Sequence, residues 1–121
     1  NMREQLLLSV LSDLNSTSTD ISASAVISTD GLPIATLLPN HLNADRVGAM
    51  SATLLALGNR AVQELACGEL DQVMVKGKSG YILLSQAGSN AVLALLAKEG
   101  GKLGLILLDA KRAAKHIADI V

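Results

Sequence analysis

The stretch that most constrains the fold is residues 26–35, VISTDGLPIA, in which Asp30 and Gly31 separate two apolar runs. The run before them alternates between apolar and polar residues, and the second run begins directly after them. Asp-Gly between two such runs is typical of a β-hairpin with a tight primed turn, because glycine adopts the required positive φ without strain. The sequence therefore predicts a hairpin turn at Asp30 and Gly31, with strands over residues 21–29 and 33–38.

A long helix is expected after this hairpin, over residues 44–67. Asn43 is a suitable N-cap, Asp45 places negative charge in the first turn, and Gly68 is the expected C-cap. Apolar or small residues cover so much of the circumference that the helix should be buried on more than one side. A chain of 121 residues can cover one side with its own sheet, so a second subunit is the natural candidate for the other.

The remaining pattern completes a single domain over residues 2–121, and we expect Asn1 to be an added residue outside the fold. The other expected elements are a first helix, three strands and a last helix, over residues 3–15, 70–76, 81–85, 91–97 and 102–120. Short connections favour an antiparallel sheet. We therefore expect an α+β three-layer sandwich in the order α-β-β-α-β-β-β-α. Its five-stranded antiparallel sheet should carry the long helix on one face and the N- and C-terminal helices on the other.

The apolar content indicates a partner surface. Hydrophobic residues make up 50% of the chain, and ten glycines come in addition. Together they exceed the roughly 45–50% of an ordinary soluble domain, and surplus apolar surface marks an interface. An alanine-rich monomeric core is the alternative. We predict a homodimer through the long helix and the third strand, an edge strand able to pair across a two-fold axis. The predicted interface residues are Val47, Met50, Ser51, Leu54, Leu55, Leu57, Gly58, Ala61, Val62, Val73 and Val75.

No motif for catalysis, a cofactor or a metal stands out. Residues 77–79, Gly-Lys-Ser, resemble the end of a phosphate-binding P-loop, but Gln72 occupies the position of its first glycine and a strand follows. His41 and His116 have no metal-ligand spacing around them. Cys67 lies at a helix C-terminus, where negative potential opposes a thiolate, so we interpret it as a small packed residue. We predict no catalytic, cofactor-binding or metal-binding residue.

Charge, aromatic content and hydropathy argue against two further classes of protein, those that bind nucleic acid and those that span a membrane. A formal net charge of −1 and 1% aromatic residues disfavour a nucleic-acid partner, which needs a basic face or stacking platforms. No apolar stretch approaches the ~20 residues of a membrane span, so we expect no direct membrane insertion. A single cysteine suits a reducing cytoplasm. The basic set Lys111, Arg112 and Lys115 is interpreted as a solvated helix face, with docking on an acidic partner as the alternative.

Taken together, these features resemble the Roadblock (dynein light chain) family, and in particular its stand-alone bacterial-type members. The resemblance rests on residues 28–35 (STDGLPIA), the element order, the small-residue long helix, the turn at 77–81 and the closing segments at 103–105 and 113–114. It implies homodimers or heterodimers with the long helices side by side and the third strands paired. It also implies a role as a scaffold or regulator of small Ras-like GTPases, sometimes with stimulated hydrolysis.

The resemblance assigns no catalytic residue to this chain. Arg46, Arg60 and Arg112 are the candidates if an arginine had to reach a nucleotide. We therefore predict a non-catalytic, dimeric, cytoplasmic module that binds and regulates, or scaffolds, a small Ras-like GTPase. Two alternatives stay open: a structural assembly module without a GTPase partner, and a small-molecule sensor domain, which would need a pocket with convergent polar groups.

Overall fold

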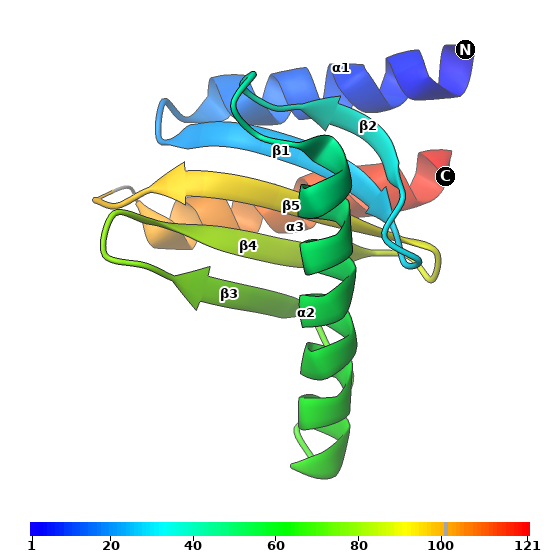
Figure 1. Cartoon of the computed structure of the whole chain (residues 1–121), viewed down its shortest axis with the longest axis vertical. Coiled ribbons are helices and arrows are strands. Elements are labelled where there is room, and N and C mark those ends of the chain that lie inside the picture. The colour runs from blue at the N-terminus through cyan, green and yellow to red at the C-terminus, as the bar shows by residue number, and fades with distance from the viewer. Residues whose placement is uncertain (101) are drawn as a thin grey trace.

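A computed structural model describes residues 1–100 and 102–121 and confirms the expected order of elements (Figure 1). The elements are α1 (Met2–Thr17), β1 (Ile21–Ser28), β2 (Pro33–Leu37), α2 (Ala44–Glu64), β3 (Gln72–Lys76), β4 (Gly80–Ala87), β5 (Ala91–Lys98) and α3 (Leu103–Ile120). The strands form one antiparallel sheet in the order β2-β1-β5-β4-β3. β3 is therefore an edge strand, as predicted, and β2 is the opposite edge.

The larger core lies between the sheet and the pair α1 and α3. Leu7 and Leu11 of α1, Leu93 of β5, and Ile106 and Ile117 of α3 are completely or almost completely buried there. The spacings of four residues in α1 and eleven in α3 are close to whole numbers of turns, so the named residues of each helix lie on one face. This arrangement confirms that the N- and C-terminal helices share one face of the sheet.

The core under α2 is smaller. Leu55 is the one large side chain of α2 that is buried there, and it packs against Ile27, Leu84 and Val92 of the sheet. Figure 1 shows why: α2 runs across the strands, and its C-terminal part extends beyond β3. The sheet therefore supports only the first part of this helix.

The hairpin forms where it was expected, but its turn differs from the prediction. The Ser28 N–H donates to the Leu32 carbonyl at 2.8 Å, and the Gly31 N–H donates to the Ser28 carbonyl at 2.9 Å, so the loop comprises residues 29–31. Gly31 has φ 93°, whereas Asp30 does not have positive φ. The prediction of a tight primed turn at Asp30 and Gly31 was therefore wrong, and the loop is a three-residue connection with glycine in the left-handed position.

The C-terminal end of α2 also differs from expectation. α2 ends at Glu64 rather than at Cys67, and Ala66 adopts the left-handed conformation with φ 56°. The Cys67 N–H donates to the Val62 carbonyl at 2.8 Å, which is the bond of a Schellman motif. Gly68, at φ 88°, follows this cap rather than forming it.

Asn1 belongs to the fold, contrary to the expectation. Its side-chain Oδ1 accepts the Glu4 N–H at 2.8 Å, so it is the N-cap of α1. An asparagine at this position satisfies one of the backbone donors that the first helical turn leaves free.

Candidate functional site

One face of α2 carries large apolar side chains that its own chain does not cover. Met50 is 57% exposed, Leu57 63%, and Leu65, the C-cap residue that follows α2, 74%. Steps of seven and eight residues bring these side chains to one side of a helix. An open hollow of about 400 Å³ lies along the same helix, beside Ala49 and Met50. This face has the character of an interface rather than of ordinary surface, because several large apolar groups are exposed along one line.

The opposite side of α2 is used within the subunit. Ser51 is fully buried and Leu55 is 4% exposed, so these two predicted interface residues serve the core of their own chain. The prediction that these two residues lie at the interface was wrong, because the sheet of the same chain covers the stripe of α2 that contains them. Gly58 also faces inward, since a Cβ there would lie 2.7 Å from Cγ2 of Val73. The other predicted residues are half-buried in the case of Val47, Leu54, Gly58, Val62 and Val73, and exposed in the case of Met50, Leu57, Ala61 and Val75.

β3 continues this surface as an unprotected sheet edge. It pairs with β4 in an unbroken register from Gln72 to Lys76, and Met74 and Val75 are 44% and 45% exposed. The other edge, β2, starts with Pro33 and has a register shift against β1. Proline and bulges block pairing with another strand. Of the two edges, β3 is thus the one suited to pair with a strand from outside.

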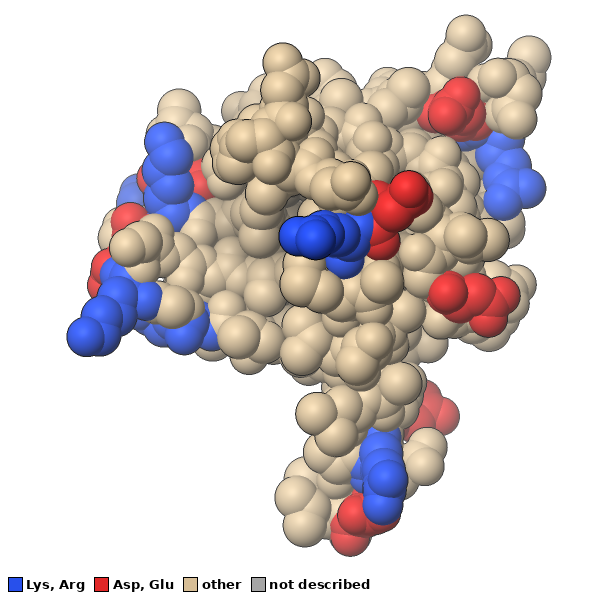
Figure 2. Space-filling model, in the orientation of Figure 1, with Lys and Arg blue, Asp and Glu red and all other residues tan. Residues whose placement is uncertain are grey.

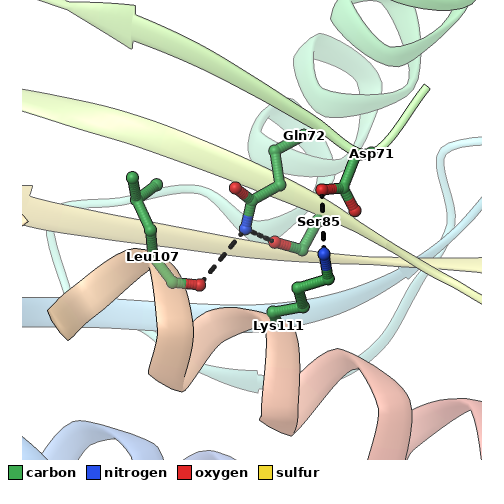
Figure 3. Close-up of polar contacts among 5 residues, drawn as sticks. All are labelled: Asp71, Gln72, Ser85, Leu107 and Lys111. Carbon is green, nitrogen blue, oxygen red and sulfur yellow. Dashed lines mark hydrogen bonds and ion pairs between the residues drawn. The ribbon is translucent and has the colours of Figure 1, made fainter. Parts of the chain in front are cut away.

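A polar clasp anchors β3 to α3 (Figure 3). Nε2 of Gln72 donates to Oγ of Ser85 at 2.9 Å and to the carbonyl of Leu107 at 3.3 Å. Beside it, Nζ of Lys111 donates to Oδ2 of Asp71 at 3.2 Å. The ion pair is exposed and contributes little, but the glutamine joins two neighbouring strands to a helix. The clasp holds the first residues of the edge strand in place from the face opposite α2.

The three candidate arginines are not brought together. Arg46 and Arg60 lie on α2, whereas Arg112 lies on α3, on the other face of the sheet. Nε of Arg60 donates to Oε1 of Glu64 at 2.9 Å, and Arg112 is 3.9 Å from Asp109. No arginine is therefore singled out by the geometry.

The remaining motifs have structural roles or none. Residues 77–79 form the turn between β3 and β4, closed by the Gly77 N–H donating to the Gly80 carbonyl at 2.7 Å. Cys67 is exposed, which corrects its interpretation as a packed residue: it follows the part of α2 that overhangs the sheet.

Over residues 1–100 and 102–121, no group of three or more His, Cys, Asp or Glu side chains could hold a metal ion. None of the helices described has the length and apolarity needed to cross a membrane.

A hollow of about 300 Å³ lies between α1 and α3. Its lining includes Val10, Asp13, Leu14, Arg112 and His116. The Arg112 and Asp109 pair borders it, so charged groups of both signs line an apolar floor.

Comparison with known proteins agrees with this architecture. The Roadblock/LC7 domain family matches residues 7–97. The uncharacterized protein MJ1340 of Methanocaldococcus jannaschii is 39% identical over 108 residues, which cover 89% of this chain and 93% of that protein. A structure of MglB with a tetrameric arrangement superposes with a TM-score of 0.88 at 20% identity, covering 99% of this chain and 90% of the other. The gliding protein MglB from Thermus thermophilus gives 0.87 at 19% identity, covering 99% and 91%.

At 20% and 19% sequence identity, the two MglB structures show that this chain shares their fold. The family match spans most of the chain, and the Methanocaldococcus relative aligns over nearly its whole length. The chain therefore belongs to the Roadblock/LC7 family.

Proposed function

We propose that this protein is a non-catalytic, dimeric interaction module that binds and regulates, or scaffolds, a small Ras-like GTPase in the cytoplasm. The observation that carries the proposal is the exposed apolar face of α2, which continues into the unprotected edge of β3. Membership of the Roadblock/LC7 family supports the GTPase partner, since the resemblance described above implies that role.

The dimer would bury Met50 and Leu57 of α2 and its C-cap residue Leu65 together with Met74 and Val75 of β3. These side chains are 44–74% exposed. Burial of a fully exposed side chain of this size contributes about 1.5–3 kcal/mol, so burial of the part still exposed contributes about 1 kcal/mol each. Ten such side chains from two subunits would supply on the order of 10 kcal/mol. Association itself costs about 4–15 kcal/mol, so apolar burial alone is comparable to the cost. Backbone pairing between two β3 strands would add directional hydrogen bonds.

Regulation of the GTPase would act through binding rather than through an inserted arginine. Arg60 and Arg112 are each within ion-pair distance of a carboxylate of their own helix. A module that holds a switch segment in one conformation shifts the equilibrium of the GTPase only by its difference in affinity for the two states. Recovery of the GTPase should therefore depend on the bound nucleotide.

The test is an affinity capture from a lysate of the source cell, with a non-hydrolysable GTP analogue in one sample and GDP in the other. The bait is the unaltered protein, and Leu57→Asp and Leu6→Asp serve as matched variants on α2 and α1. We expect a small GTPase in one nucleotide state only, retained by Leu6→Asp and lost with Leu57→Asp. Equal recovery in both states would support the scaffold form of the proposal. No GTPase in either sample would overturn it in favour of a structural module.

A further inference from the structure

Lysines gather at one end of the sheet, although the chain as a whole is slightly acidic. This lysine end comprises Lys76 at the end of β3, Lys78 in the β3–β4 turn, Lys98 at the end of β5, and Lys102 at the N-cap of α3. Residue pairing brings them together, because Gly80 pairs with Lys98 and Tyr81 pairs with Lys76. Figure 2 shows a group of basic side chains at the left, with acidic side chains among them, where these turns lie in Figure 1.

The local charge is positive after the nearby carboxylates are counted. Glu99 pairs with Lys76 at 3.6 Å, and Asp20 lies at the same end, where its carbonyl accepts the Lys98 N–H. Within the part of the chain that the structure describes, Lys78, Lys98 and Lys102 form no ion pair. The lysine end therefore has an excess of two positive charges, against −1 for the whole chain.

Exposed leucines follow Lys102 along the chain, on the first turns of α3. Leu105 is 47% exposed and Leu108 45%. They are three residues apart and turn away from the core, which α3 contacts through Ile106 and Ala110. An apolar ridge bordered by long, flexible lysines is the composition of a surface that rests at a lipid interface, with the leucines in the acyl boundary and the ammonium groups at the headgroups.

We propose that the lysine end and the Leu105–Leu108 ridge dock this protein peripherally on an anionic membrane surface, without a spanning segment. The proposal goes beyond the proposed function and does not depend on it. An anionic lipid surface attracts lysines and takes up apolar side chains at the same time, which fits both features of this end of the molecule. Nucleic acid is disfavoured, because the described residues at this end include neither arginine nor an exposed aromatic ring.

The test is co-sedimentation of the full chain with vesicles. One set is pure phosphatidylcholine, and the other contains about a third phosphatidylserine, a typical anionic lipid. We expect binding to the second set only, weakened by added salt. Each lysine near such a surface contributes roughly fivefold in partitioning, so the double variant Lys78→Glu and Lys102→Glu should bind more than about twentyfold more weakly.

A matched double variant, Arg46→Glu and Lys115→Glu, changes the net charge equally but lies away from the lysine end. It should keep most of the binding. Leu105→Ser with Leu108→Ser should reduce binding several-fold while the far-ultraviolet circular dichroism stays unchanged. Equal binding to both vesicle sets, or equal loss in both charge variants, would overturn the proposal. Salt-sensitive binding to random duplex DNA without any vesicle binding would overturn it in favour of a nucleic-acid surface.

Discussion

Gly48 is the residue at which α2 touches the β1–β2 hairpin. A Cβ there would collide with the backbone oxygen of Gly31, and a Cβ on Gly31 would lie 3.4 Å from Cβ of Ala52. The loop at 29–31 therefore rests on the helix. The local sequence did not predict the three-residue form of this loop, and the contact with α2 lies outside that local sequence. Backbone is less able to move aside than a flexible side chain, so the contact tolerates little change.

Gly48→Ala should therefore lower the free energy of unfolding by about 1–3 kcal/mol, although alanine normally favours a helix by about 1 kcal/mol. Gly104→Ala is the matched control in α3, where a Cβ would meet nothing within 4 Å. The control should be more stable than the unaltered protein by about 0.5–1 kcal/mol. Urea unfolding at equal protein concentration measures both changes. If both variants gained stability alike, the close contact at Gly48 would be refuted.

Tyr81 carries a buried hydroxyl that has no hydrogen-bond partner among the described residues. Burial raises the pKa of Tyr81, and the charge of Asp20 raises it further. Because the folded pKa lies above the unfolded value, ionisation favours the unfolded state only above about pH 10. Ionisation of Tyr81 should therefore leave stability unchanged at neutral pH, and stability should fall as the pH rises from the unfolded pKa towards the folded one.

Tyr81→Phe should remove this alkaline loss of stability and should raise stability at neutral pH by about 1 kcal/mol, because an unpaired buried hydroxyl is costly. Tyr81 is the only tyrosine, and the chain has no tryptophan, so an ultraviolet absorbance titration reports this group alone. A midpoint at or below the ordinary tyrosine value would show that the hydroxyl is solvated.

At the scale of elements, β3 is held by backbone pairing with β4, by the packing of Val73 under α2 and by the hydrogen bonds of Gln72. Sequence periodicity could predict that this strand exists, because its apolar pattern is local, and its place directly after the long helix led to the prediction of an edge position. It could not predict the clasp, because Gln72 bonds to groups 13 and 35 residues away. For the same reason, it could not separate the α2 stripe buried by the sheet, with Ser51 and Leu55, from the exposed stripe with Leu57. The two stripes have similar apolar patterns in the sequence, and only their packing against the sheet distinguishes them.

Gln72→Ala should loosen the start of β3 while leaving the rest of the sheet intact. The loss of the side-chain donor should cost about 1 kcal/mol, and amide hydrogens of β3 should exchange faster than those of β1 and β5. Gln86→Ala on β4 is the control, since its half-buried side chain makes no hydrogen bond in the described structure. Equal exchange in the two variants would show that the clasp does not anchor the strand.

At the scale of the whole molecule, the two faces of the sheet are used differently. The face under α1 and α3 is closed by a large core, whereas α2 covers its face thinly and overhangs β3. The order of elements and the three layers could be predicted because each follows from local periodicity and short connections. The lysine end could not, since its members are separated in sequence and meet only through strand pairing.

The central claim is that α2 and β3 form the contact between two copies of the chain, and the molar mass in solution tests it most directly. Sedimentation equilibrium should give twice the chain mass for the unaltered protein and for Leu6→Asp, whose site is exposed on α1. Leu57→Asp should give a folded monomer, because a carboxylate would be buried at the contact without a partner. A monomeric unaltered protein at micromolar concentration, or a Leu57→Asp variant that stays dimeric, would contradict the account.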